Sequence, residues 1–77
     1  MDLQSPGPYH EPPPPHELAG IRRGHFCRLK MDSSYIWAMV QGFQHGQIIG
    51  MVESSFPGGP RRGDIITFTK KHVFEIN

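Results

Sequence analysis

From residue 25 onward, the chain contains a series of short runs of alternating apolar and polar residues, separated by glycine or polar turns. An alternation with a period of two is typical of strands that bury one face. Such runs cover residues 25–31, 35–43, 47–53, 64–69 and 73–76. They predict a mainly β domain, either a small, strongly bent five-stranded antiparallel sheet or an SH3-like or OB-like partly open barrel.

The alternation also assigns side chains to faces. In the first run, Cys27 and Leu29 are expected to point inward. The run 35–43 is the strongest predicted strand, because aromatic and β-branched residues dominate it. Its two faces carry Tyr35, Trp37, Met39 and Phe43 on one side and Ile36, Ala38 and Val40 on the other. Both faces are apolar, so we expect a central or strongly curved strand with Trp37 in the core.

Glycines mark the turns. Gly46 closes a three-residue hairpin signal, because glycine takes positive φ without strain. Gly50 lies within a predicted strand and indicates a bulge or a sharp bend. Two segments, 22–27 and 61–66, share a pair of arginines, a glycine and the start of a strand. We do not treat six similar residues as evidence of an internal duplication.

The N-terminal segment holds six of the eight prolines. Proline lacks an N–H and fixes φ, so the run 12–15 is excluded from helices and inner strands and favours polyproline II. We expect a disordered proline-rich arm over residues 1–16 and a small β domain over 17–77. Removal of residues 1–11 should then leave the melting temperature nearly unchanged. Two alternatives are a ligand for an aromatic groove and an arm that packs along the domain.

Length and composition exclude several classes of protein. A chain of 77 residues forms one domain at most, and so small a core leaves little stability for a deep active site. The net charge of +1 gives no general attraction to nucleic acid or membrane. One cysteine and the absence of a signal-peptide pattern predict a cytoplasmic protein. The longest apolar stretch, 36–40, is too short to cross a bilayer, so no membrane partner is expected.

No set of residues has the spacing of a catalytic or metal site. The five histidines form no closely spaced ligand pair, and Cys27 has no second cysteine, so no metal and no cofactor are expected. Asp64 follows a glycine at a strand start and is expected to accept a backbone N–H in its turn. Because no base or second carboxylate is placed beside it, the sequence predicts a protein that is not an enzyme.

A family resemblance starts at Pro12. Its matching segments are Gly24 to Met31, Tyr35 to Val40, Gly50, Pro57, Gly63 to Phe68 and His72 to Ile76. On these residues the chain resembles the bacterial domain-of-unknown-function family 2314. The resemblance implies a compact β fold and no established activity, and it associates the chain with bacterial or phage conflict and inhibitor proteins. His25 departs from the family pattern, which has an acidic residue there.

Two sets of side chains are candidates for binding. The aromatic candidates are Tyr35, Trp37 and Phe56, and the basic candidates are Arg22, Arg23, Arg61 and Arg62. The arginines would form one cationic patch if the sheet brought both glycine turns to one end. We expect a non-catalytic binding module that acts through a protein–protein interface. The alternative is a weak nucleic-acid-binding barrel with arginines on phosphates and aromatics on bases. The sequence sets no oligomeric state.

Overall fold

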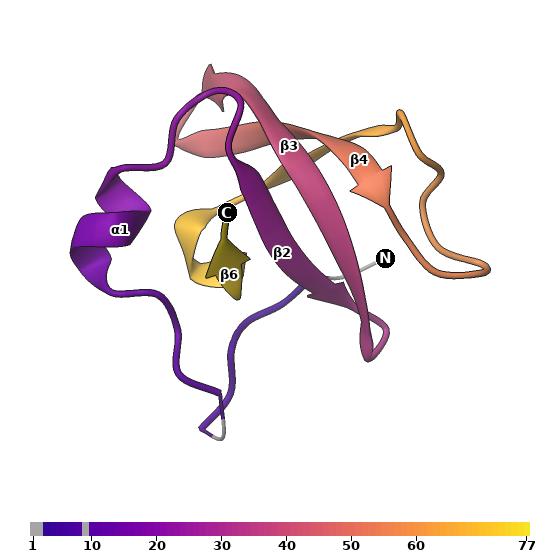
Figure 1. Ribbon diagram of the computed structural model, residues 1–77, viewed down its shortest axis with the longest axis horizontal. Coiled ribbons are helices and arrows are strands. Elements are labelled where there is room, and N and C mark those ends of the chain that lie inside the picture. The colour runs from indigo at the N-terminus through magenta and orange to yellow at the C-terminus, as the bar shows by residue number, and fades with distance from the viewer. Residues whose placement is uncertain (1–2, 9) are drawn as a thin grey trace.

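The computed structural model describes residues 3–8 and 10–77. Its strands form one six-stranded sheet. The strands are β1 (Leu3–Gln4), β2 (Phe26–Met31), β3 (Ser34–Gln44), β4 (Gln47–Ser54), β5 (Ile65–Phe68) and β6 (Glu75–Ile76). A short helix, α1, spans Pro15–Ala19, and a 3₁₀-helix, η1, spans Lys70–His72 (Figure 1). The prediction of a mainly β fold with a bent antiparallel sheet is confirmed.

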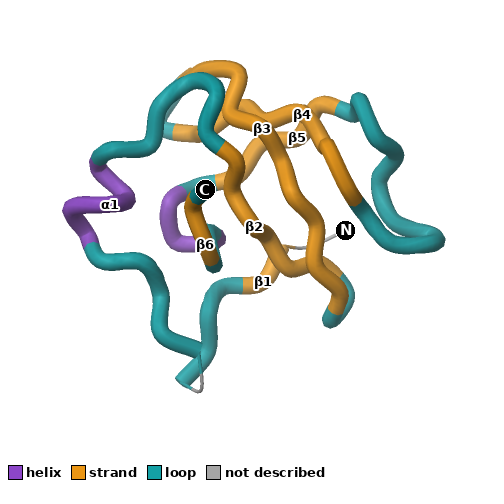
Figure 2. The backbone as a smooth tube through the Cα atoms, viewed as in Figure 1, coloured by secondary structure: helices purple, strands orange, loops and turns teal. Residues whose placement is uncertain are grey.

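Antiparallel ladders join the strands in the order β1-β2-β3-β4-β5. After β5 the chain passes through η1, and β6 returns to pair with β2. One edge of β2 therefore carries β6 opposite Cys27 and Arg28 and β1 opposite Lys30 and Met31 (Figure 2). Within residues 3–8 and 10–77 no ladder joins β5 to β6, so the sheet curls without closing into a barrel.

Two-residue turns connect the three central strands. Asp32 and Ser33 join β2 to β3 with φ of 51° and 62°. His45 and Gly46 join β3 to β4 with φ of 51° and 77°. Positive φ at both positions gives the backbone twist that matches the twist of the flanking strands. The three-residue hairpin expected at residues 44–46 is one residue shorter in the structure, because Gln44 pairs with Gln47.

The core lies on the inner face of the curled sheet. Its fully buried residues include Cys27, Leu29, Ile36, Ala38, Val40, Ile48, Val52, Phe68 and Val73. The inward positions predicted for β2 are confirmed. In β3 the even-numbered residues face the core, so Trp37 is half-buried on the outer face and does not occupy the core position expected from the sequence.

Two β-bulges bend the ladder between β3 and β4. The register skips one residue between Val40 and Gly42, which makes Gln41 an extra residue in β3. A second skip, on β4, makes Glu53 the extra residue. The first bulge reverses the alternation, so Phe43 pairs with Ile48 on the core side and is 53% exposed near the hairpin end. Simple alternation wrongly placed Phe43 on the face of Trp37.

The proline-rich arm lies along the domain. Leu3 pairs with Met31 and packs against the core, and the Ser33 N–H donates a hydrogen bond to Gln4 Oε1 at 2.9 Å. Between β1 and α1 the chain follows a path that lies below β6 in the view of Figure 2. For the described residues this differs from the expected disordered arm, and α1 crosses the expected boundary between residues 16 and 17. Residues 1, 2 and 9 of the arm lie outside the described residues.

Candidate interaction surface

The first basic turn, residues 22–25, leads the chain into β2. The His25 N–H donates to the Arg22 carbonyl at 3.0 Å, and the Arg22 N–H donates to His25 Nδ1 at 3.1 Å. Gly24 has φ of 93°, the positive value that the third position of a type II turn requires. Val40 of β3 holds the turn, because it accepts from the Gly24 N–H at 2.8 Å and donates to the His25 carbonyl at 2.7 Å.

The second basic turn, residues 61–64, leads into β5 with the same hydrogen bonds. The Asp64 N–H donates to the Arg61 carbonyl at 3.0 Å, and Asp64 Oδ2 accepts from the Arg61 N–H at 2.9 Å. Gly63 has φ of 94° and donates to the Val52 carbonyl at 2.7 Å. Val52 in return donates to the Asp64 carbonyl at 2.9 Å. The role expected for Asp64, fixing its turn through a backbone N–H, is confirmed.

A local twofold axis relates the two turns. It passes between Met39 and Met51, which pair with each other across β3 and β4. Rotation about this axis exchanges Val40 with Val52, the two residues that hold the basic turns. It also exchanges the two bulges of this ladder. The four central strands therefore form two equivalent halves, β2 with β3 and β5 with β4.

The outer strands obey the same symmetry. Phe26 pairs with Met39, and Ile65 pairs with Met51. Leu29 of β2 pairs with Ile36, and the equivalent residue of β5, Phe68, pairs with Ile48. The similarity between residues 22–27 and 61–66 is thus matched by nearly equal φ at the two turn glycines, by equivalent hydrogen bonds and by equivalent register.

An apolar row crosses the outer face between the two basic turns. It consists of four cross-strand neighbours, Phe26, Met39, Met51 and Ile65. Ile65 is 61% exposed and the other three are half-buried. The first basic turn directly precedes Phe26, and the second directly precedes Ile65. A pair of exposed arginines therefore lies just beyond each end of the apolar row.

The structure separates the four arginines into two pairs. β2 and β5 are antiparallel to each other with two strands between them, and their first residues, Phe26 and Ile65, are the two ends of the apolar row. The two basic turns therefore leave the row at opposite edges and in opposite directions along the strands. The single cationic patch considered from the sequence does not form. Arg62 Nη2 lies 3.9 Å from Glu53 Oε2. Because Glu53 is a bulged residue of β4, this contact draws the Arg62 side chain toward the sheet.

The aromatic candidates have three different surroundings. Trp37 lies opposite Arg28 on the outer face. Tyr35 is 37% exposed, and the Arg28 guanidinium carbon lies 3.8 Å from the centre of its ring. Phe56 packs against the core, and a Cβ on Gly59 would come within 2.7 Å of its Cζ. Phe56 thus anchors the loop before the second basic turn to the core, and it is not part of the apolar row.

Sequence reasoning missed the apolar row itself. Phe26, Met39, Met51 and Ile65 belong to four strands, and only the register of three ladders makes them neighbours. The arginine and glycine repeat was the available signal, because strands that start alike with matching registers place equivalent residues side by side.

The one cysteine of the chain is buried in the core. Burial raises the pKa of the Cys27 thiol to about 11, so at neutral pH the sulfur is protonated and a poor nucleophile. Residues 3–8 and 10–77 contain no group of three or more histidine, cysteine or acidic side chains arranged to hold a metal ion. In the same part of the chain, each helix is too short or too polar to cross a membrane. The outer face remains the best-formed candidate site.

Comparison of the chain with protein-family models, with curated proteins and with solved structures found no match. The resemblance to family 2314 stays a prediction. What the outer face does must therefore be inferred from its own residues, their register and their charge.

A third turn also uses a side chain to hold its backbone. In residues 69–72, the His72 N–H donates to the Thr69 carbonyl at 3.0 Å, and the Thr69 N–H donates to His72 Nδ1 at 3.1 Å. This bond requires an unprotonated Nδ1. Burial, and then the charge of Lys71, lower the pKa of His72 below its usual 6.5. Both causes disfavour the protonated ring that would break the turn.

Acidification is therefore expected to destabilise the fold through His72. Because its pKa is lowered in the folded state, its stabilising contribution is present above pH 6.5 and is lost as pH falls through the folded-state pKa. The melting temperature should fall between about pH 7 and pH 5. The melting temperature of the His72→Asn variant should fall less over this range, because an amide oxygen accepts the same hydrogen bond without titrating. Equal falls for both proteins would contradict the assignment.

Proposed function

We propose that the chain is a non-catalytic binding module that docks an acidic segment of a partner protein on the outer face of its sheet. The observation behind this proposal is the apolar row between two equivalent arginine turns. Burial of an apolar row supplies affinity. Arginines at the rim orient an acidic partner and speed its association. The near-neutral total charge matters less than these two local charges.

The dimensions of the row suit a short extended segment. Four adjacent strands span three spacings of about 4.8 Å, or roughly 14 Å. An extended peptide rises about 3.4 Å per residue, so about four residues cover the row. The two turns lie beyond opposite ends, and one or two further acidic residues on each side would reach them. A segment with apolar residues flanked by carboxylates fits this surface.

The chemistry of the row favours protein over nucleic acid. Methionine side chains are flexible and polarizable, and they adapt to varied apolar partners. Bases instead stack on flat aromatic rings, each contributing about 1–3 kcal/mol. Of the four residues of the row, only Phe26 is aromatic. Nucleic-acid binding through the same arginines is the alternative that an experiment must separate.

Met51→Asp is expected to abolish capture of a protein partner from cell extract while circular dichroism shows an intact fold. Met51 lies at the centre of the row and is half-buried, so the carboxylate removes apolar contact and repels an acidic ligand. Thr67→Asp is the matched control, because Thr67 is exposed on the same face outside the row. It should retain most of the binding.

The same proteins should be titrated with single-stranded and duplex oligonucleotides at about 50 mM salt, where phosphate contacts are strong. We expect no measurable binding. Tight, salt-dependent binding of an oligonucleotide without capture of any protein would overturn the proposal and assign the outer face to nucleic acid.

A further inference from the structure

Phe74 is buried in an unusual place. It is 4% exposed, yet it lies outside the contiguous cluster of buried core residues. Its ring packs on His10 of the arm, with centroids 4.8 Å apart, and on Tyr35 of β3, at 5.6 Å. Part of the cover over Phe74 is therefore the arm itself. If the arm left, an aromatic surface made by Phe74 and Tyr35 would become accessible.

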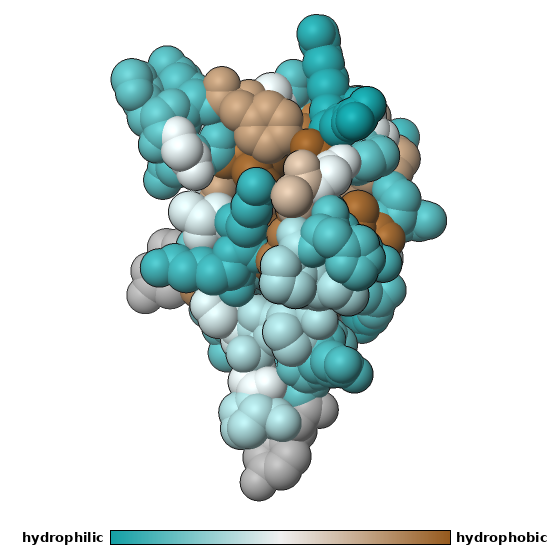
Figure 3. All heavy atoms as spheres, turned by 90° about the vertical axis from the view of Figure 1, so that its left-hand side faces the viewer, coloured by the Kyte–Doolittle hydropathy of each residue, from teal (hydrophilic) through white to brown (hydrophobic). Residues whose placement is uncertain are grey.

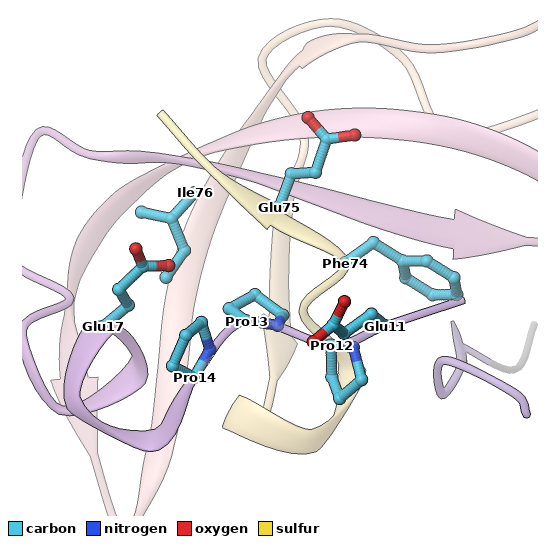
Figure 4. Close-up of a pocket in the computed structure, with 8 residues that line it drawn as sticks. All are labelled: Glu11, Pro12, Pro13, Pro14, Glu17, Phe74, Glu75 and Ile76. Carbon is cyan, nitrogen blue, oxygen red and sulfur yellow. The ribbon is translucent and has the colours of Figure 1, made fainter.

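The arm's prolines lie between two hollows next to this ring, with Pro13 half-buried and Pro12, Pro14 and Pro15 exposed. On one side, Pro12, Pro13 and Pro14 border a pocket with Phe74, Glu75 and Ile76 (Figure 4). On the other side, Pro6, Pro12, Pro13 and Pro15 border a second pocket with Leu18, Lys70, Lys71 and Val73. The two pockets and the prolines between them occupy one depression of the domain surface, which we call the arm groove. Its walls are Leu18, Lys70, Val73, Phe74, Glu75 and Ile76.

The arm groove is suited to the shape of a polyproline II segment. Pro14 has φ of −60° and ψ of 152°, which are polyproline II values. Prolines have no N–H, so the run cannot extend the sheet as another strand. Of the run 12–15 only Pro13 is half-buried, so the arm packs loosely on the domain. A polyproline II segment is already ordered before it binds, so it loses little conformational entropy. On the side that carries α1, only small apolar patches reach the surface (Figure 3).

The arm is an imperfect ligand for its own groove. Glu11 borders the same pocket as Glu17 and Glu75. Glu75 forms an ion pair with Arg28, so its charge is compensated. Glu11 and Glu17 are both exposed carboxylates that line this pocket, so its rim carries uncompensated negative charge. A proline-rich segment with a basic residue in place of Glu11 would face an attractive charge instead.

We propose that the arm groove is a binding site for proline-rich segments in the polyproline II conformation. In this chain the arm occupies the groove loosely, as a weak intramolecular ligand. The occupant from outside is a proline-rich segment of a partner protein with a basic residue at the position of Glu11. A tethered arm has an effective concentration in the millimolar range, so only a better-matched segment displaces it. This site is separate from the outer face and does not depend on the function proposed for it.

Titration of the full chain with arm peptides tests the proposal. The probes are a peptide of residues 3–15, the same peptide with Glu11→Lys, and a control peptide. The control carries Glu11→Lys and has alanine in place of the prolines at positions 12–14. Nuclear magnetic resonance would follow the backbone amides of residues 73–76. The Glu11→Lys peptide should shift them saturably, and it should bind about two- to fivefold tighter than the unchanged peptide, as an exposed ion pair allows. The alanine control should give no saturable shift.

Two variants of the full chain sharpen the test. Glu11→Lys within the chain should hold the arm more firmly and weaken binding of the free peptide. The triple variant Pro12→Ser, Pro13→Ser, Pro14→Ser should loosen the arm, and it should therefore bind the free peptide more tightly than the wild type does. Absence of shifts at residues 73–76 in the wild type and in the triple variant would overturn the proposal, as would equal binding of the alanine control. A dimer formed by exchange of arms would instead assign the groove to a second copy of this chain.

Discussion

Gly50→Val is expected to destabilise the domain by about 3 kcal/mol or more. Gly50 lies on the core side of β4, and a Cβ there would sit 2.9 Å from Cε1 of Phe68 and 3.2 Å from Cβ of Ala38. Both neighbours are fully buried, so neither can move into solvent. Overpacking of a core typically destabilises by about 1–3 kcal/mol or more, and a branched side chain at so close an approach belongs at the upper end. Urea unfolding followed by circular dichroism would measure the loss.

A second substitution distinguishes this clash from a general intolerance of β4. Gly50→Ala combined with Phe68→Leu should be more stable than the sum of the two single changes predicts, because leucine withdraws the ring edge that meets the new Cβ. Strict additivity, or a wild-type urea midpoint for Gly50→Val, would show that the contact with Phe68 is not the limiting one.

Charge reversal at both basic turns is expected to remove binding of the acidic partner. The two changes are Arg22→Glu with Arg23→Glu, and Arg61→Glu with Arg62→Glu. Because a twofold axis relates the turns, each double change should weaken binding by a similar factor, about tenfold for 1.4 kcal/mol. The turns share no contact, so the two effects should add, and the variant with all four arginines changed should bind about a hundredfold more weakly than the wild type. Titration calorimetry with the captured partner at two salt concentrations would measure these factors.

The third turn supplies the matched control. Lys70→Glu with Lys71→Glu makes the same change in total charge, but these lysines border the arm groove and not the outer face. Binding should stay within about twofold of wild type, as rim charges outside an interface contribute little. An equal loss in this control would show that total charge governs binding. A loss carried by one arginine pair alone would show that the symmetry of the backbone does not extend to recognition.

The sequence predicts well those features that depend on near neighbours along the chain. Alternation alone identifies the inward faces of Cys27 and Leu29, because the side-chain period of a strand is two. Gly50 was expected to mark a bend or a bulge. In the structure it sits beside a bulge, where the ring of Phe68 leaves no room for a side chain.

Features that depend on pairing between strands could not be predicted. The bulged residues Gln41 and Glu53 have no local signature, and the first of them moves Phe43 to the core side. Trp37 could not be assigned to a face because both faces of its strand are apolar. The apolar row likewise arises from three registers, so the candidate surface could be predicted only as separate arginines and aromatics.

The arm shows the limit of composition as evidence. Six prolines predict a segment without regular structure, and the described part contains only the two-residue strand β1 and the first turn of α1. Composition cannot show that Phe74 lies where the arm passes. Leu3 and His10 both contact the domain. Removal of residues 1–11 should therefore lower the melting temperature more than the sequence predicts.

The pairing of β6 with β2 gives the two surfaces different histories during folding. Arg28 and Glu75 meet across 47 residues of chain, whereas β2, β3 and β4 meet across two-residue turns. Closing a long loop costs more entropy than closing a short one, so contacts within the hairpins form ahead of the last strand. The central part of the outer face is assembled by these early hairpins, but one wall of the arm groove is β6. Recognition at the groove is therefore available only to chains that have completed folding.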